Sequence, residues 1–413
     1  MKCVVGDDVV LSRSLEGPLS SQIAGFSNWV FEEGYALYSR HRQVRLAACF
    51  SRWLGQHGVR RGSVTSEHVR RYLRFRAGQV KICRGDPAAL AKFISFLRHA
   101  GVIPPEKHLA RRLTPVEQAA REFECYLVDQ RALASASVLH YVSLVRGFLA
   151  DLFGKGGVDL SSLCARTVVR FVQQEAPRLH LKRAKLLTTA LRAFLHYARY
   201  RGDITHDLAA AVPCVASWSM TSIPRAIPPD LVRRLLASIN RQTALGQRDY
   251  AILLLLARLG LRAGEVVRIE LEDLDWKAGS MSVQRKGGQR SVLPLPANVG
   301  AAIAAYLRRA RPRNTSCRRV FLRSRAPFRG LQGAGAIASL VRHNLIRAGI
   351  EAPTYGAHQF RHGLATDMLR HGASLAEIGE VLGHRSPETT RIYTKVDLNA
   401  LRPLALAWPG GIR

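Results

Sequence analysis

The carboxyl-terminal third of the chain holds the side chains that could do chemistry on a phosphodiester. That reaction needs a nucleophile, positive charge on the non-bridging oxygens, and a proton for the leaving oxygen. A tyrosine hydroxyl, arginine forks, and histidine or lysine meet these three needs. Six residues are our candidates for the site: Arg262, Lys286, His358, Arg361, His384 and Tyr393. Their types predict phosphodiester cleavage through a covalent tyrosine ester, without a metal.

The two arginines and the lysine supply the positive charge. Arg262 follows a helix break at Gly260, which leaves its guanidinium free to point into a cleft, where Glu265 could hold it. Arg262 and Arg361 would clamp the phosphate oxygens with forked donors. Lys286 stands at the tip of an expected hairpin that could enter the minor groove. There its ammonium could protonate the departing sugar oxygen.

The two histidines lie where they could move protons. His358 and Arg361 are three residues apart at a helix start, so both face one side. His384 sits in a turn nine residues before Tyr393, which ends a short helix. One histidine could take the tyrosine proton, and the other could donate to a phosphate oxygen. Taken singly, each candidate has a simpler interpretation as a packing or surface residue. Only the combination favours catalysis.

The charge of the chain points to a polyanionic partner. Lys and Arg total 62 against 30 Asp and Glu, so the formal net charge is +32. Such a surface repels itself unless a polyanion neutralises it. Nucleic acid is the first candidate and an anionic membrane surface the second. Arg outnumbers Lys, which suits forked phosphate contacts.

The cysteines and the apolar runs favour a cytoplasmic protein. Seven cysteines are scattered without a Cys-x-x-Cys pair or a zinc-like spacing to histidine. No charged start followed by an apolar run marks a signal peptide. The longest apolar run, residues 251–257, is far too short to span a bilayer.

Two segments of the first half look like copies of each other. Each has an amphipathic helix, a short helix behind Ser or Thr, and a helix that ends in aromatic-x-x-aromatic and Gly. Matching positions lie about a hundred residues apart, a domain-sized spacing. The alternative is that two small helical bundles merely look alike. We assign residues 1–112 to an additional helical module, 113–205 to a second one, and 206–228, which are rich in proline, to a linker.

The remaining segment, residues 229–396, is expected to be a mixed α/β domain, followed by a tail over 397–413. Short alternating runs around Gly287-Gly288 predict a hairpin, to which residues 320–322 add a third strand. Helices are expected over residues 248–262, 334–347, 360–371, 375–382 and 387–394. The fold class is therefore mainly α, with helical modules ahead of a domain that contains a small antiparallel sheet.

In this order, the six candidates resemble the tyrosine recombinases, also called the phage integrase family. The shared elements lie within residues 222–396 and read Gly-Leu-Arg-x-x-Glu, a hairpin Lys-Gly, His-x-x-Arg and Leu-Gly-His-x-Ser-x-x-Thr-Thr-x-x-Tyr. The resemblance implies that five of the residues assemble around the scissile phosphate while Tyr393 bonds to the DNA 3′ end. It also implies that residues 113–205 are a SAM-like core-binding domain that closes over the other face of DNA. It fades before residue 113.

The resemblance further implies that the reaction needs no cofactor, because the phosphotyrosine stores the energy of the broken bond. Recombination between two duplexes requires four active sites, hence a homo- or hetero-tetramer on double-stranded DNA. The apolar tail, which includes Leu398, Leu401 and Trp408, fits docking onto a neighbouring subunit or packing on its own domain equally well.

Other functions compete with recombination. A type IB topoisomerase shares the chemistry but acts as a monomer, and a non-catalytic DNA-binding protein would have lost one or more of the six residues. A membrane-associated protein is disfavoured because no basic amphipathic helix or lipidation signal is present. Within recombination, the extra module and the basic charge favour a mobile-element or plasmid-borne integrase over other roles.

Overall fold

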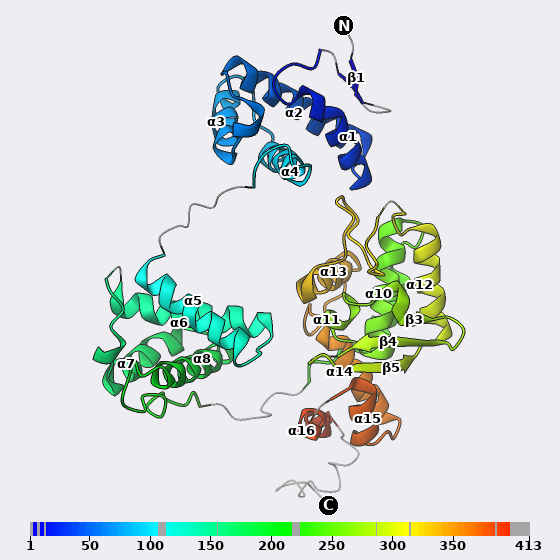
Figure 1. The fold of residues 1–413 in the computed structure, drawn as a ribbon. Coiled ribbons are helices and arrows are strands. Elements are labelled where there is room, and N and C mark those ends of the chain that lie inside the picture. The colour runs from blue at the N-terminus through cyan, green and yellow to red at the C-terminus, as the bar shows by residue number, and fades with distance from the viewer. Residues whose placement is uncertain are drawn as a thin grey trace, which may run out of the picture. The chain divides into compact units, whose positions relative to one another are not determined.

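Figure 1 shows three groups of helices along the chain. The computed structural model describes residues 3–5, 9–11, 14–105, 113–154, 156–216, 224–285, 287–313, 315–384 and 386–396. Lys107–Thr221 form one compact unit, and the two flanking segments make up the other. Each helical group has a hydrophobic core of its own. The predicted fold class, mainly α with a small antiparallel sheet, is confirmed.

Four helices build the N-terminal module, residues 14–105. They are α1 (Ile23–Glu32), α2 (Leu37–Gln56), α3 (Ser66–Ala77) and α4 (Asp86–His99), with a 3-10 turn at Arg61–Ser63. Phe26, Phe50 and Phe93 fill the core with no exposed surface. The strands β1 (Cys3–Val5) and β2 (Val9–Leu11) precede the helices as an antiparallel pair. The sequence pattern predicts only helices here, because three-residue strands are too short to show an alternating pattern.

The second bundle has the same order of elements. It consists of α5 (Pro115–Asp129), α6 (Ser135–Phe153), a 3-10 turn at Leu160–Ser162, α7 (Ala165–Glu175) and α8 (Leu181–Tyr200). A capping box between Thr114 and Glu117 starts α5. The core also takes in Leu208, Ala209 and Val212, which lie inside the segment that the sequence analysis assigned to the linker.

One helix of this bundle, α6, is long and apolar enough to cross a membrane by length and composition alone. Its buried residues include Val142, Val145 and Phe148, and all three belong to the core of the bundle. Burial of one apolar stripe against neighbouring helices is the pattern of a core helix.

The C-terminal domain combines a three-stranded antiparallel sheet, in the order β3-β4-β5, with helices around it. Its elements are α9 (Pro229–Ala237), α10 (Ala244–Leu259), α11 (Ala263–Val266), β3 (Leu274–Asp275), β4 (Ser280–Gln284), β5 (Arg290–Pro294), α12 (Ala297–Arg309), α13 (Gly333–Arg347), α14 (His358–Arg370), α15 (Leu375–Leu382), α16 (Pro387–Thr390) and a final 3-10 helix, Arg391–Val396.

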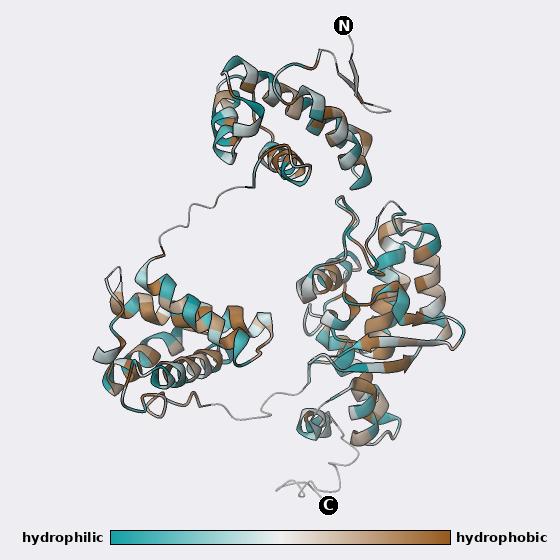
Figure 2. Cartoon of the chain, in the orientation of Figure 1, coloured by the Kyte–Doolittle hydropathy of each residue, from teal (hydrophilic) through white to brown (hydrophobic). Residues whose placement is uncertain are grey.

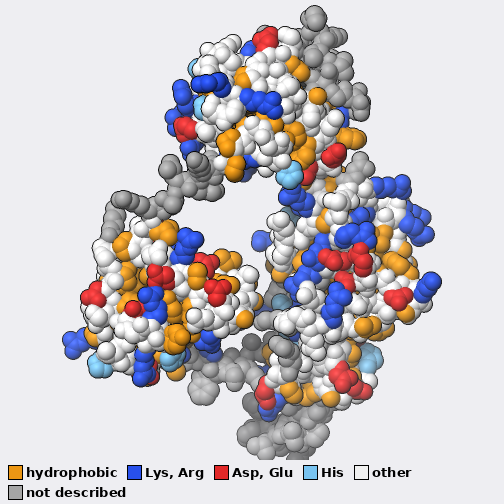
Figure 3. Space-filling model, viewed as in Figure 1, with side chains coloured by type: hydrophobic (Ala, Val, Ile, Leu, Met, Phe, Trp, Pro, Cys, Tyr) orange, Lys and Arg blue, Asp and Glu red, His pale blue; other side chains and the backbone are white. Residues whose placement is uncertain are grey.

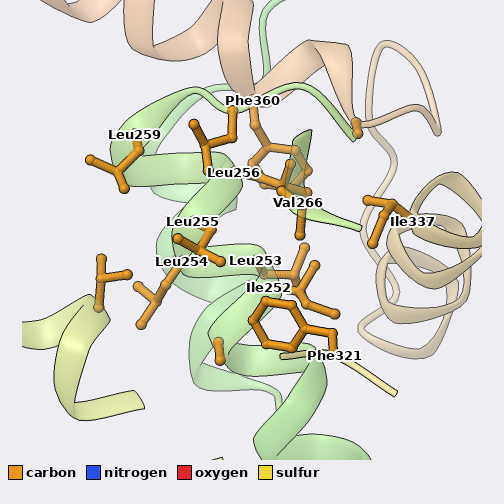
Figure 4. Packing of buried hydrophobic residues seen from close by; sticks show 14 of the residues in the cluster. Ile252, Leu253, Leu254, Leu255, Leu256, Leu259, Val266, Phe321, Ile337 and Phe360 are labelled. Atoms are coloured by element: carbon orange, nitrogen blue, oxygen red, sulfur yellow. The ribbon is translucent and has the colours of Figure 1, made fainter. Parts of the chain in front are cut away.

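Helix α10 is the centre of this domain. Apolar residues run along it (Figure 2), and residues 251–256 are all at most 2% exposed, so the central part of the helix is buried on every side. Figure 4 shows Phe321, Ile337 and Phe360 reaching toward it from other segments. Because its central part is buried all round, α10 is held rigidly. The position of its carboxyl end is therefore fixed.

A smaller hydrophobic cluster joins the last helices. Ala365 of α14 packs with Ile378 and Leu382 of α15 and with Tyr393 of the 3-10 helix. This cluster is what places Tyr393 relative to α14.

The third strand of the sheet is β3, and not residues 320–322 as predicted. Val320 and Phe321 are buried, but in the part of the chain that the structure describes their segment pairs through the isolated bridges Glu270–Arg319 and Leu322–Gly330 and joins no strand of the sheet. A short apolar run indicates burial, and burial alone does not require ladder pairing. Two other predictions, on Lys286 and on the tail 397–413, lie outside the described residues.

Candidate active site

The site begins at the carboxyl end of α10. Gly260 caps the helix in the left-handed region, with φ +58°. A Cβ at Gly260 would lie 2.8 Å from Leu382 Cδ2 and 3.0 Å from Leu364 Cδ2, so α14 and α15 pack directly on this turn. The chain then reaches Arg262, the residue before the first turn of α11.

Glu265 holds Arg262 at two points. One oxygen of its buried carboxylate accepts the Arg262 backbone N–H at 2.8 Å, and the other accepts the guanidinium at 2.9 Å. The Arg262 side chain remains 24% exposed, so the fixed guanidinium can still meet an anion from solvent. Its second nitrogen lies 3.5 Å from the Gly383 carbonyl.

Arg361 lies deeper and joins two helix ends. Its guanidinium donates to the Gly260 carbonyl at 2.8 Å and to the Leu382 carbonyl at 2.6 Å. Arg361 is 3% exposed, and this burial, together with the positive charge of Arg262, lowers its pKa to about 10. The residue is still charged at neutral pH. Arg361 thus both ties α15 to α10 and adds positive charge beside Arg262.

Arg285 is a third arginine of this cluster and is not among the six residues predicted from the sequence. Its guanidinium, 5% exposed, lies 3.5 Å from Glu265 and donates to the Val381 and Leu382 carbonyls at 3.3 Å each. Burial, the main cause, lowers the pKa of Arg285. The residue directly precedes Lys286, so it anchors the base of the predicted hairpin to α15.

Tyr393 lies inside the site rather than at its edge. Its ring is 1% exposed, and its hydroxyl lies 3.0 Å from Nδ1 of His362, a residue of α14 that the sequence analysis also missed. Burial raises the pKa of Tyr393, which the charges of Arg361 and Arg262 partly oppose. The phenol is therefore protonated at neutral pH and needs a proton acceptor before it can attack.

His362 can be that acceptor. Burial, then the nearby His358 and Arg361, lower its pKa to about 4, so the imidazole is neutral at neutral pH. Its partner His358 begins α14, is exposed, and lies with its ring centroid 6.3 Å from that of His362. The spacing of four residues puts both on one face of the helix.

His384 also lies beside the tyrosine. Its ring lies parallel to that of Tyr393, with 6.4 Å between centroids, and its Nδ1 lies 2.8 Å from Thr390 Oγ1. Burial, followed by the charges of Arg361 and Arg262, lowers the pKa of His384 to about 4. The contact with Thr390 uses one ring nitrogen and fixes the orientation of the ring.

A cavity of about 540 Å³ opens beside this cluster. Arg285, Gly383, His384 and Thr390 line it together with residues of α15 and β5. Among the described residues, the structure brings together Arg262, Arg361, His384 and Tyr393 of the six candidates, with His358 one helical turn away from His362. In this cluster three guanidiniums accompany the Glu265 carboxylate. An oxyanion that enters therefore meets excess positive charge next to a phenol that contacts a neutral imidazole.

Comparisons with known proteins show what this chain is similar to. The model of the phage integrase family matches residues 225–399. A putative integrase/recombinase, y4rA of Sinorhizobium fredii (strain NBRC 101917 / NGR234), is 54% identical over 410 residues, which are 99% of each chain. The tyrosine recombinase XerD of Mycobacterium tuberculosis (strain ATCC 25618 / H37Rv) is 30% identical over 302 residues, 69% of this chain and 94% of that one.

Solved structures share the fold. The XerH site-specific recombinase bound to a palindromic difH substrate has a TM-score of 0.56 at 18% identity, over 76% of this chain and 93% of that one. A lambda integrase tetramer bound to a Holliday junction has a TM-score of 0.52 at 14% identity, over 76% and 88% of the two chains. Together with the near full-length similarity to y4rA, the fold and the clustered side chains show that this chain belongs to the phage integrase family of tyrosine recombinases.

Proposed function

We propose that this tyrosine recombinase cleaves and rejoins DNA strands through an ester between Tyr393 and a 3′ phosphate. The observation that carries the proposal is the position of the Tyr393 hydroxyl, 3.0 Å from a neutral imidazole and in the same cluster as Arg262 and Arg361. A nucleophile, an acceptor for its proton and charge for the phosphate are thereby next to each other.

The reaction balances without a cofactor. The Tyr393 oxygen bonds to phosphorus, its proton passes to His362, and the bond from phosphorus to the 5′ oxygen breaks. Lys286 donates the proton that the leaving oxygen takes, as the sequence predicts for a lysine at the hairpin tip. Arg262 and Arg361 compensate the charge of the phosphate oxygens, and His384 and His358 complete the site. A 5′ hydroxyl then attacks the tyrosine ester and reseals the strand.

The helical domains would hold the duplex. Residues 113–205 serve as the core-binding domain and residues 229–396 as the catalytic domain, with 206–228 between them. Residues 1–112 are an additional module, and the tail 397–413 docks in cis or on a neighbour. The working assembly is a tetramer on double-stranded DNA, which the tetrameric lambda integrase on a Holliday junction supports by analogy. The biological role is integration or transposition of a mobile or plasmid-borne element in the cytoplasm.

Tyr393→Phe tests the proposal, with Tyr355→Phe as the matched control because Tyr355 lies in the same domain and is 44% exposed. The proteins are incubated with pooled duplex DNA fragments, and DNA that stays attached after denaturation is recovered and measured. We expect wild type and Tyr355→Phe to retain DNA covalently, whereas Tyr393→Phe retains none and still binds DNA before denaturation. Undiminished covalent capture by Tyr393→Phe would overturn the proposal.

A further inference from the structure

The N-terminal module and the second bundle contain the same cluster of aromatic rings. Four rings in each occupy corresponding positions: Phe26, Trp29, Phe93 and Phe96 in the first, and Phe123, Tyr126, Phe194 and Tyr197 in the second. The Phe26–Phe93 centroids lie 4.8 Å apart and those of Phe123–Phe194 5.3 Å apart. The neighbouring pairs Phe26–Trp29 and Phe123–Tyr126 are both stacked, at 22° and 20°.

A further ring contact repeats between the second and third helices of each bundle. Phe50 of α2 meets Tyr72 of α3 at 5.2 Å, and Phe148 of α6 meets Phe171 of α7 at 5.0 Å.

The last helix of each bundle ends in the same way. Gly101 and Gly202 have φ values of +66° and +80°, and each donates its N–H at 3.0 Å to the carbonyl three residues earlier. A buried isoleucine, Ile103 or Ile204, follows two residues later. Both last helices therefore stop at a glycine that leaves the right-handed region. Equivalence of rings, caps and element order is more than two unrelated helical bundles would share.

We propose that residues 14–105 are a second copy of the core-binding module and bind duplex DNA through the exposed arginines of α3. The inference rests on the proposed function, because it takes the DNA-binding role of residues 113–205 as its starting point. The partner is the sugar-phosphate backbone of double-stranded DNA, recognised by charge rather than by base sequence.

The outward face of α3 is strongly basic. Arg70, Arg71 and Arg74 are exposed, and the spacing of three and four residues puts them on one side of the helix. The 3-10 turn before α3 adds exposed Arg60 and Arg61. Figure 3 shows Lys and Arg side chains gathered on this side of the module. We call these five residues the α3 basic face.

Little negative charge opposes this face. Glu67 is the acidic residue of α3, and it accepts a hydrogen bond from Arg70 at 2.8 Å. An exposed pair of this kind is weak and can exchange for a phosphate. At the positions equivalent to Arg70 and Arg74, helix α7 has Val169 and Gln173, so this face is more basic in the first copy than in the second.

One basic position occurs in both copies. Arg71 corresponds to Arg170, at an offset of 99 residues, when Tyr72 is matched to Phe171, and both arginines are exposed. A basic side chain at the same position of two otherwise divergent surfaces fits a shared polyanionic partner.

A buried carboxylate fixes the loop that carries Lys81 and Arg84. Asp86, 3% exposed, accepts the Cys83 backbone N–H at 3.2 Å and pairs with Arg42 at 2.6 Å. It also lies 3.7 Å from Arg76, on the inner side of α3. The loop is therefore held next to α3, and its basic residues Lys81 and Arg84 are exposed.

Charge neutralisation in the full-length protein tests the inference. We compare wild type with the variant Arg70→Gln, Arg71→Gln, Arg74→Gln, using a long random-sequence duplex over a range of KCl concentrations. The log–log salt slope should become shallower by about 0.9 for each phosphate that the variant no longer neutralises, hence by up to about 3. The footprint on the duplex should also shorten.

Two further variants make the result specific. The variant Arg308→Gln, Arg309→Gln, Arg313→Gln removes three exposed charges from the end of α12 and the segment that follows it, and it should keep the salt slope of the wild type. The second variant, Arg60→Gln, Arg61→Gln, changes residues outside α3 and so cannot weaken the helix itself. It should make the salt slope shallower by up to about 2. Equal slopes and footprints for wild type and for both variants of the α3 basic face would overturn the inference.

The covalent capture assay separates this failure from failure of the proposed function. If wild type forms the Tyr393 adduct while the α3 variants match its salt slope, only the second DNA-binding surface is refuted. If wild type neither binds nor captures DNA, the proposed function itself fails, and the inference fails with it.

Discussion

Nδ1 of His362 lies 3.0 Å from the hydroxyl oxygen of Tyr393. A neutral imidazole has one donor and one acceptor nitrogen, so the protonated phenol donates to Nδ1 in the tautomer that carries its proton on Nε2. Two residues that are 31 positions apart are therefore joined by a hydrogen bond. His362, the residue after Arg361, is therefore a better candidate for the proton acceptor than the predicted His358 or His384.

Replacing His362 by Gln should slow the formation of the covalent adduct. Positioned general bases contribute between a hundredfold and ten-thousandfold, so we expect a loss of at least about a hundredfold in the single-turnover cleavage rate. DNA affinity should change little, because His362 faces the tyrosine. Quenched-flow cleavage measurements and equilibrium binding, made on the same protein, separate the two quantities.

His371→Gln is the control for that experiment. His371 follows the carboxyl end of the same helix, α14, and pairs with Asp367 at 3.8 Å near solvent. It should cleave at the rate of the wild type. If His362→Gln also cleaves at that rate at every pH tested, His362 is not the acceptor and only packs against the ring.

Arg285→Met should destabilise the catalytic domain. The substitution removes a buried charge that pairs with Glu265 and satisfies the carbonyls of Val381 and Leu382. Breaking a buried pair leaves its partners unsatisfied, and we expect a loss of about 3 kcal/mol in the free energy of unfolding. Arg290→Met is the matched control, because Arg290 is 70% exposed and pairs with Asp273 at 3.4 Å. Its loss should stay below about 1 kcal/mol, and equal urea midpoints for the two variants would contradict the structural role of Arg285.

Residues with strong local signals were predictable from the sequence. Helix α15 spans the predicted residues 375–382 because Ser374 caps its start, through a bond from the Glu377 N–H at 3.3 Å, and Gly383 ends it at φ +61°. Helix α10 begins at Ala244 rather than at the predicted residue 248, because the Thr243 side chain accepts the Gly246 N–H and caps the helix. No apolar pattern follows Thr243 directly, so the sequence did not indicate this start.

His362 and Arg285 are the two site residues that were not predicted, and the sequence contained a signal for only one of them. His362 follows His358 by one helical turn, so the spacing did contain a signal for a second imidazole on that face. Arg285 had none. A charged residue at the end of a strand is ordinarily exposed, and its burial depends on Glu265 and α15, which lie 20 and nearly 100 residues away. Such long-range pairing is decided by tertiary packing.

Gly260→Ala should displace the end of α10 and with it Arg262. Alanine in the left-handed region costs about 1 kcal/mol, and the added Cβ, 2.8 Å from Leu382, adds an overpacking cost of roughly 1–3 kcal/mol. Gly349→Ala is the control that measures the cost of the left-handed backbone alone. Gly349 has φ +61°, and no atom lies within 4 Å of an added Cβ. Urea unfolding should show the larger loss for Gly260→Ala, together with reduced cleavage. Equal losses in both variants would show that α14 and α15 can move away without cost.

Stability of the catalytic domain should fall as the pH drops below neutral. The pKa values of His362 and His384 are about 4 in the folded protein, against an ordinary value of 6.5. Between these limits the unfolded chain binds more protons than the folded one, so the free energy of unfolding rises with pH in this window and levels off above it. The double variant His362→Gln, His384→Gln removes both groups, and its unfolding free energy should depend less on pH than that of the wild type between about pH 4 and pH 6.5. Urea titrations of both proteins across that window test this, and parallel curves would mean that the two imidazoles keep ordinary pKa values despite their burial beside three arginines.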